Sequence, residues 1–334
     1  MTAPGTDTDT VTARDTVAAL DAVAARDTAA ATDAGAAHLV EIADGVFAYV
    51  QPDGGWCLSN AGLVVGADAQ AVLVDTAATE RRARRLRTEV LRIAAAPPRT
   101  LVTTHFHGDH TFGHRFFPEA VVVAHENART EMAAAGLGLT TLWPDVKWGD
   151  IGLTLPQVTY QDRLTLHLGE DRAELIHLGP AAHTTGDTAV WLPRQRVLFA
   201  GDVVMNGVTP FCLMGSVSGS LAALRRLRAL GPAVVVPGHG PVGGPELLDA
   251  DGEYFQWLTR QAQAGAAAGL SPLELARAQG PGPYAALRDA ERLVPNLHRA
   301  YAELAGAAPG TPLDVGALFR EMTAYHGGLP ACHA

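Results

Sequence analysis

The chain has 334 residues, of which 48% are hydrophobic and 18% charged, with 35 acidic against 25 basic side chains. This length corresponds to about two domains and is enough to bury a sizeable core. The net charge of −10 argues against sequence-independent binding to nucleic acid or to anionic membranes, because both require a cationic surface.

Cysteine usage and hydropathy favour a cytoplasmic location. The three cysteines, Cys57, Cys212 and Cys332, are odd in number and far apart, so they predict no disulfide framework. The N-terminus lacks the basic and apolar segments of a secretory signal, and no stretch approaches the ~20 apolar residues of a membrane helix. We expect a soluble protein without a membrane partner.

Residues 1–37 are mostly alanine, threonine and aspartate, which predicts a disordered or weakly helical acidic tail. From His38 onward, short β-type runs alternate with helical patterns. Strands are expected at 46–50, 61–65, 71–74, 100–103 and 120–124, and again at 164–168, 173–177, 188–192, 197–200 and 233–236. With helices at 79–93 and 220–230, this order favours two β-sheets between helices in a domain over 38–245.

After Pro245 the pattern becomes helical. Helices are expected at 247–264, 272–278, 284–292, 297–305 and 313–325. We interpret 246–334 as a C-terminal helical region that packs on one edge of the sandwich.

The most informative segment is residues 103–110, TTHFHGDH, which follows an apolar strand. In an extended loop, side chains two residues apart point the same way, so His105 and His107 can converge on one ion. Asp109 and His110, at the start of the next helix, are aimed at a neighbouring point. Imidazole with carboxylate suits Zn²⁺ or iron. Packing is a poor explanation, because buried unpaired imidazoles are costly.

Three further candidates are His183, Asp202 and His239, each in a loop beside an apolar run and close to a glycine. Each alone could be a turn or capping residue. Together they raise the supply to five histidines and two aspartates, which fits two metal ions with open coordination positions.

These motifs, in this order over residues 46–240, resemble the metallo-β-lactamase fold superfamily. The resemblance implies an α/β fold, a four-layer αββα sandwich with a C-terminal helical extension. It also implies two zinc ions per chain, with iron or manganese as alternatives. The first ion would be held by His105, His107 and His183, the second by Asp109, His110 and His239, and Asp202 would bridge both.

Two features refine this resemblance. The bridging aspartate looks like the glyoxalase II and lactonase type. Asp75 matches the family's usual carboxylate that orients a ligand, and a helix-capping role explains it equally well.

A narrower resemblance comes from residues 54–62 (GGWCLSNAG) and 324–334, which look like the metallo-β-lactamase-fold cyclases of actinomycete aromatic polyketide pathways. That family implies ring closure by intramolecular aldol condensation and dehydration, and it allows for release of the acyl chain from an acyl carrier protein. Asp109 or Asp202, or a hydroxide held by the metals, would act as base. Family members often carry asparagine where this chain has His326, so the role of His326 stays open, as do those of Cys332 and His333.

A cyclase and a hydrolase of this fold need the same metal ligands. Only the residues that line the pocket can therefore indicate which of the two this protein is. The candidates for its lining are Trp56, Trp143, Trp148, Phe211 and Met214. An aromatic, mostly apolar pocket would suit a flat polyketide.

Three alternatives remain open: a dinuclear zinc thioesterase or lactonase, a mononuclear-iron sulfur dioxygenase, and a non-catalytic binding protein. Serine hydrolysis and nucleotide binding are disfavoured, since the chain lacks GxSxG, GxGxxG and GxxxxGK in suitable contexts. A homo-oligomer is compatible with the sequence, which leaves the oligomeric state open.

Overall fold

Short strands build two β-sheets in this protein, for which the computed structural model describes residues 37–66 and 70–334. Residues 37–334 form one compact unit. The acidic tail predicted from the sequence lies, apart from Ala37, outside the described residues.

The first sheet has the strand order β1-β2-β3-β4-β5-β6-β7. Its strands β1 to β4 form an antiparallel meander, whereas β4 to β7 run parallel. The bounds are β1 Leu39–Ala43, β2 Val46–Tyr49, β3 Ala61–Val65, β4 Ala71–Val74, β5 Thr100–Val102, β6 Val121–His125 and β7 Val158–Tyr160.

The second sheet has the order β12-β11-β10-β9-β8, and only its β11–β12 pair is parallel among the described strands. The bounds are β8 Arg163–Leu168, β9 Asp171–His177, β10 Thr188–Leu192, β11 Val197–Met205 and β12 Val234–His239. The two sheets pack face to face: a Cβ atom at Gly62 in β3 would lie 2.2 Å from Cε1 of Phe199 in β11. Glycine is therefore needed at position 62 for this close approach.

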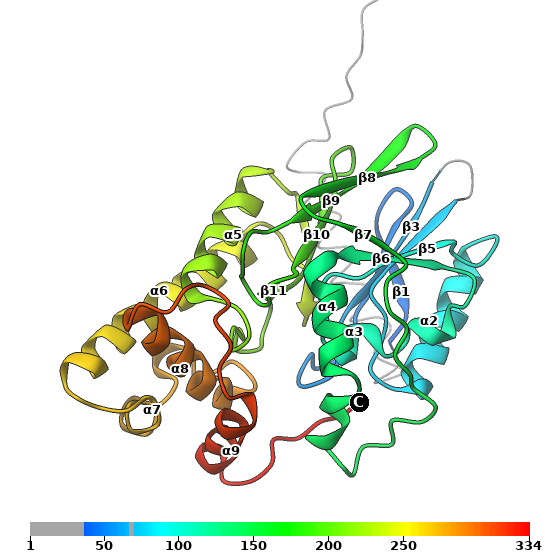
Figure 1. The fold of residues 1–334 in the computed structure, drawn as a ribbon. Helices are drawn as coiled ribbons and strands as arrows, with labels where there is room; N and C mark the ends of the chain where they lie inside the picture. Colours follow the sequence, from blue (N-terminus) through cyan, green and yellow to red (C-terminus); the bar gives the residue numbers. More distant parts are fainter. Residues whose placement is uncertain (1–36, 67–69) are drawn as a thin grey trace, which may run out of the picture. The chain divides into compact units, whose positions relative to one another are not determined.

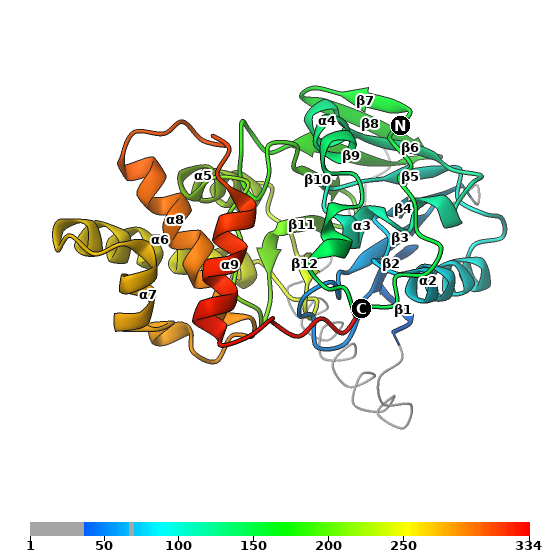
Figure 2. The same cartoon turned by 60° about the horizontal axis from the view of Figure 1, so that its bottom comes forward.

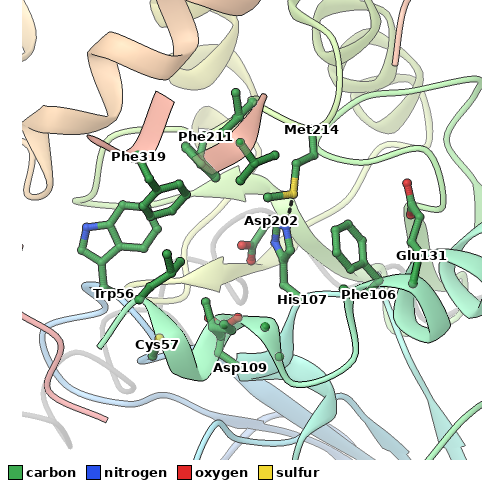
Figure 3. A pocket seen from close by; sticks show the side chains of 18 of the residues that line it. Trp56, Cys57, Phe106, His107, Asp109, Glu131, Asp202, Phe211, Met214 and Phe319 are labelled. Carbon is green, nitrogen blue, oxygen red and sulfur yellow. Dashed lines mark hydrogen bonds between the residues drawn. The ribbon is translucent and has the colours of Figure 1, made fainter. Parts of the chain in front are cut away.

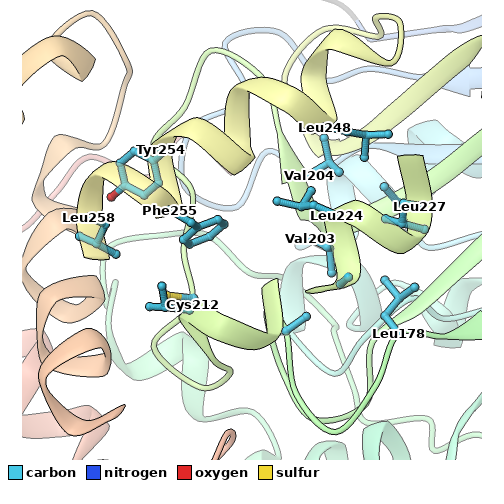
Figure 4. Packing of buried hydrophobic residues seen from close by; sticks show 14 of the residues in the cluster. Leu178, Val203, Val204, Cys212, Leu224, Leu227, Leu248, Tyr254, Phe255 and Leu258 are labelled. Atoms are coloured by element: carbon cyan, nitrogen blue, oxygen red, sulfur yellow. The ribbon is translucent and has the colours of Figure 1, made fainter. Parts of the chain in front are cut away.

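Helices cover the outer face of each sheet (Figure 1). Helix α2 (Glu80–Ile93) is capped by Thr79 and buries Ala83, Leu86 and Val90 against the first sheet. Helices α5 (Val217–Ala229) and α6 (Glu246–Ala267) cover the second sheet, where Val203, Leu224 and Leu248 belong to one apolar cluster (Figure 4). This helix–sheet–sheet–helix order confirms the predicted four-layer sandwich.

The remaining helices flank these layers. Helices α3 (Gly108–Thr111) and α4 (Glu126–Ala135) follow β5 and β6 along the chain, and α7 (Pro272–Gln279), α8 (Leu293–Leu304) and α9 (Val315–His326) follow α6. Single 3-10 turns occur at η1 His114–Phe116, η2 Gly138–Thr141, η3 Gly282–Tyr284 and η4 Ala290–Arg292. After α9 the chain runs back toward α2, where Arg82 donates a hydrogen bond to the carbonyl of His333 (Figure 2). None of the described helices has the length and apolar character needed to cross a membrane.

The structure corrects several predicted elements. The helix expected at 284–292 is wrong: η3 and η4 are separate turns, because Asp289 adopts a left-handed φ of +54° and the carbonyl of Arg288 accepts hydrogen bonds from Thr209 instead. Strands β1 and β7 and helix α4 were not predicted. Both strands are short and lie at the two edges of the first sheet. Each is stabilised by hydrogen bonds to its one neighbouring strand and not by an alternating apolar sequence that would reveal it.

Strand β11 is longer than predicted. The pair Gly201-Asp202 suggests the end of a strand, but Gly201 takes a φ of +53° at an irregularity in the register with β12, and the strand continues to Met205. Asp202 therefore lies inside β11 rather than after it, and His239 is the last residue of β12.

Candidate metal centre

The structure brings together all seven predicted metal ligands. His105 and His107 lie on the loop after β5, and Asp109 and His110 belong to α3. The other three come from the β9–β10 loop, β11 and β12. They form two groups in which the ligand atoms lie within 4.8 Å of one another: His105, His107, His183 and Asp202 in one, and Asp109, His110 and His239 in the other.

Asp202 faces both groups. Its Oδ2 lies 3.7 Å from Nε2 of His105 and 3.5 Å from Nε2 of His183. In the other group, Oδ2 is 3.5 Å from Nε2 of His239, and Oδ1 is 3.1 Å from Nε2 of His110. Both oxygens of this buried carboxylate are thus directed at imidazole nitrogens.

The unpaired polar atoms fit a pair of cations. Nε2 of His110 and Oδ1 of Asp202 are buried and lie 3.1 Å apart without hydrogen-bond geometry between them, and neither atom has another hydrogen-bond partner. Such atoms are costly in a protein interior unless another group satisfies them. Nitrogen and carboxylate oxygen are ligands that zinc and related divalent metals accept. The residues present therefore could hold two divalent metal ions.

Four of the five histidines are oriented by oxygen atoms of the scaffold. Nδ1 of His105 lies 3.0 Å from Oγ1 of Thr104. Nδ1 of His183 lies 2.6 Å from the carbonyl oxygen of Phe211, and Nδ1 of His239 lies 2.9 Å from that of Gly54. These contacts leave the opposite nitrogen of each ring turned toward the cluster.

Asp75 orients the fourth histidine. Its Oδ2 lies 2.9 Å from Nδ1 of His110 and accepts from Oγ1 of Thr104 at 2.7 Å, while its Oδ1 accepts from the backbone N–H of Thr104 at 2.8 Å. Of the two roles considered from the sequence, orientation of a ligand is the one seen in these contacts.

The electrostatics of the cluster couple its acids to its bases. Burial and the neighbouring His183 lower the pKa of His107 to about 3, which favours the neutral imidazole that binds metals. Burial alone raises the pKa of Asp109, but His110 and His239 bring it down to about 2. Burial disfavours the charged form of His239, yet Asp202 and Asp109 raise its pKa to about 9.

A pocket of about 800 Å³ opens above this cluster (Figure 3). His107, Asp109, Asp202 and His239 line it on the side of the metal cluster. The other lining side chains are mainly apolar and include Trp56, Phe106, Phe211, Leu213, Met214, Leu313 and Phe319. Three of the residues predicted from the sequence to line the pocket are among them: Trp56, Phe211 and Met214.

Trp143 and Trp148 do not line this pocket, contrary to the prediction. The buried Trp143 packs behind Trp56, with ring centroids 5.4 Å apart, and its Nε1–H donates to the carbonyl of Pro330 at 2.7 Å. Trp148 stacks edge-on against Phe112 and donates to the carbonyl of Trp143 at 3.3 Å. Both indoles support the wall from behind.

Comparison with known proteins identifies the family. A family model described as "Metallo-beta-lactamase superfamily" matches residues 54–239, which is more than half of the chain. The chain belongs to the metallo-β-lactamase superfamily. Membership confirms the wider resemblance seen in the sequence.

Relatives within the superfamily carry different names. The chain is 26% identical over 221 residues to a "Metallo-beta-lactamase type 2" of Bacteroides fragilis, covering 63% of this chain and 82% of that protein. It is 30% identical to the "2,4-dinitroanisole O-demethylase subunit alpha" of Nocardioides sp. (strain JS1661), covering 59% of this chain but only 54% of the subunit. A solved metallo-β-lactamase from Pontibacter korlensis superposes with a TM-score of 0.54 at 24% identity, covering 66% of this chain and 99% of the other.

This solved structure shares the fold, and the named relatives are enzymes. Superfamily membership and the clustered ligands support an enzyme of the metallo-hydrolase type that binds divalent metal ions. Neither named relative is a polyketide cyclase.

Several pocket residues were not predicted because they come from distant parts of the chain. Phe319 of α9 packs on Trp56 with ring centroids 6.0 Å apart. The buried guanidinium of Arg292 lies 4.1 Å over the Trp56 ring, and Glu291 accepts from Nε1 of Trp56 at 2.7 Å. The only available signal was the helical spacing of Val315, Leu318, Phe319 and Met322, which indicates a packed face without showing what it packs against.

The C-terminal residues left open by the sequence occupy two different places. His326 is exposed, with Nδ1 3.0 Å from the carbonyl oxygen of Gly328. Cys332 packs against the apolar cluster that contains Cys57, and both thiols are free. This C-terminal segment therefore reaches the outside of the pocket wall, because Cys57 lines the pocket.

Proposed function

We propose that this superfamily member is a metal-dependent polyketide cyclase that closes a later ring of an aromatic polyketide by intramolecular aldol condensation and dehydration. The observation that carries the proposal is the pocket: about 800 Å³, walled by Trp56, Phe211 and Phe319, with the ligand cluster along one side. Aromatic walls favour flat, partly aromatic substrates, which stack on them. The similarity of residues 54–62 and 324–334 to such cyclases supports the same reading.

The metal assignment is part of the proposal. His105, His107 and His183 would hold one ion and Asp109, His110 and His239 the other, with Asp202 shared. Zinc is the proposed metal, and iron or manganese are the alternatives. When bound, such ions supply Lewis-acid polarisation of carbonyl oxygens.

In the proposed reaction, the carboxylates of Asp109 and Asp202 would move the protons. Both belong to the ligand cluster and line the pocket. One of them would take a proton from a methylene carbon between two substrate carbonyls. That carbon then bonds to a second carbonyl carbon of the same molecule, and the oxygen of that carbonyl is protonated. Loss of a second proton from the methylene carbon, with departure of the new hydroxyl as water, completes the ring.

A second candidate is hydrolysis of a thioester or lactone. The similarity to the Bacteroides fragilis metallo-β-lactamase supports it. Such hydrolysis would use the same clustered ligands as the cyclase. A combined activity, in which ring closure accompanies thioester release, would make an acyl carrier protein the partner of this chain.

Mass spectrometry separates these candidates. Zinc-loaded protein is incubated with a partly cyclised aromatic poly-β-ketone, beside a panel of simple thioesters and lactones. We expect loss of water to a fused-ring product, reduced at least about 100-fold in His107→Ala and Asp202→Asn, because each removes a proposed ligand. The control is Asp150→Asn, an exposed carboxylate paired with Arg115. Addition of water to the simple esters, with the polyketone unchanged, would replace the cyclase with a hydrolase.

A further inference from the structure

His107 differs from the other four clustered histidines in the partner of its outer nitrogen. Its Nδ1 faces the cluster, 3.1 Å from Nε2 of His105 and 2.9 Å from Nε2 of His183. Its Nε2 points away from the cluster and lies 3.1 Å from Sδ of Met214 (Figure 3). The four other histidines have a scaffold oxygen in that position.

The contact between His107 and Met214 is weak by its chemistry. With Nδ1 turned to the cluster, a neutral His107 that binds a metal through Nδ1 carries its proton on Nε2. A thioether sulfur is a poor acceptor for this N–H, whereas histidine ligands usually donate to a carboxylate, carbonyl or water. The unbranched methionine side chain also changes rotamer easily.

The position of the pair connects it to the substrate. His107 and Met214 both line the pocket and are both only partly buried. The backbone of His107 is held as the N-cap residue of α3, and its carbonyl accepts from Oγ1 of Thr111 at 3.0 Å. The Nε2–H donor of His107 is therefore held in place, while the Met214 sulfur that faces it can move away by a change of rotamer.

We propose that His107 presents its Nε2–H to the substrate as a hydrogen-bond donor, and that Met214 is a placeholder which an acceptor oxygen of the substrate displaces. The substrate class is an aromatic molecule with a carbonyl or phenolic oxygen beside the cluster. This inference rests on the proposed function only for the identity of that substrate.

The test uses two small probes of similar shape, 1-tetralone, which carries a ketone oxygen, and tetralin, which lacks it. Zinc-loaded protein labelled with ¹⁵N-histidine is titrated with each probe. The His107 Nε2–H resonance, assigned by its absence in His107→Asn, is expected to shift with 1-tetralone and to stay in place with tetralin. An unchanged resonance with bound 1-tetralone would overturn the proposal.

The variant Met214→Leu removes the sulfur and keeps the apolar bulk. We expect it to bind 1-tetralone about 2- to 5-fold more tightly, because the N–H no longer has to leave an acceptor, and tetralin with unchanged affinity. Met132→Leu, the same substitution at a buried residue of α4 outside the pocket, is the matched control. Weaker binding of the ketone by Met214→Leu would contradict the placeholder role.

Metal affinity provides a readout independent of probes and turnover. A displaceable partner contributes little to holding His107, so zinc affinity in Met214→Leu should stay within about 3-fold of the parent, against a loss of ~10–100-fold for a firmly oriented ligand. A loss in the larger range would make Met214 a fixed orienting residue and overturn the proposal. Ring closure without the resonance shift would support the proposed function and refute this inference. A resonance shift without ring closure would support this inference and refute the proposed function.

Discussion

At the scale of single residues, the metal centre depends on a carboxylate that lies outside the ligand set. Asp75 adopts a φ of +58°, a left-handed conformation that is unfavourable for a residue with a side chain. Three hydrogen-bond partners on Thr104 and His110 hold it there. Such strain persists only where surrounding contacts over-determine the conformation, and here they fix the ring of His110.

Replacing Asp75 with asparagine tests this role. Asparagine keeps the shape but loses the negative charge and one acceptor oxygen facing His110. We expect zinc affinity to fall about 10- to 100-fold, as measured by competition with a chromophoric chelator. Glu119→Gln serves as control, since Glu119 pairs with Arg87 away from the cluster. An unchanged affinity in a folded Asp75→Asn protein would show that His110 needs no outer carboxylate.

At the scale of elements, α6 is tied to β11 by a buried acid. Asp251 of α6 is 5% exposed, and its Oδ2 accepts from the backbone N–H of Met205 at 2.8 Å. Burial raises the pKa of Asp251 to about 8. Because no cation is among the contacts that shift this pKa, the carboxyl group is best accommodated in its protonated form.

This raised pKa predicts that Asp251 lowers the free energy of unfolding as the pH rises. The proton on Asp251 favours the folded state, so its contribution is complete below about pH 4 and is lost as the pH rises through about 8. Asp251→Asn keeps an acceptor for Met205 and cannot ionise. We expect the advantage of the variant over the parent in free energy of unfolding to grow by on the order of 4 kcal/mol between pH 5 and pH 8.5, because each pH unit below about 8 costs the parent about 1.4 kcal/mol.

Urea unfolding at the two pH values measures this difference. Asp249→Asn on the same helix is the control, because Asp249 is exposed and its pair with Arg228 contributes at most about 1 kcal/mol. A variant equally stable relative to the parent at both pH values would show that Asp251 is ionised without penalty.

At the scale of the whole molecule, the end of the chain completes the pocket wall from outside. Trp143 donates to the carbonyl of Pro330, and Arg82 donates to that of His333. Cys332 packs into the same apolar cluster as Trp56, Cys57 and Phe319. None of the seven clustered ligands is hydrogen-bonded to residues 330–334 in the described structure.

Removal of residues 330–334 should weaken the pocket wall and leave the metal centre intact. We expect a loss of about 1–3 kcal/mol in stability, because the buried indole N–H of Trp143 loses its acceptor. Affinity for 1-tetralone should fall, while zinc affinity stays unchanged. Thermal unfolding and the two titrations test this, with exposed His326→Ala as control. A parallel loss of zinc would show that the segment also supports the cluster.

The sequence by itself determined the local features. Alternation along an extended loop placed His105 and His107 on one side. The apolar residues Ala83, Leu86 and Val90 recur at helical spacing, and they are the residues that α2 buries. The resemblance supplied the layer order and the grouping of ligands. These features depend on neighbours within a few residues, or on a motif order that a whole superfamily shares.

Only the tertiary structure decided which distant side chains meet. Phe319 rather than Trp143 reaches the pocket, a bulge at Gly201 carries β11 past Asp202, and Cys332 lies beside the cluster of Cys57. The contact between His107 and Met214 joins residues 107 positions apart. Spacing along the chain contains no information on such pairs, because they arise from the packing of complete elements against one another.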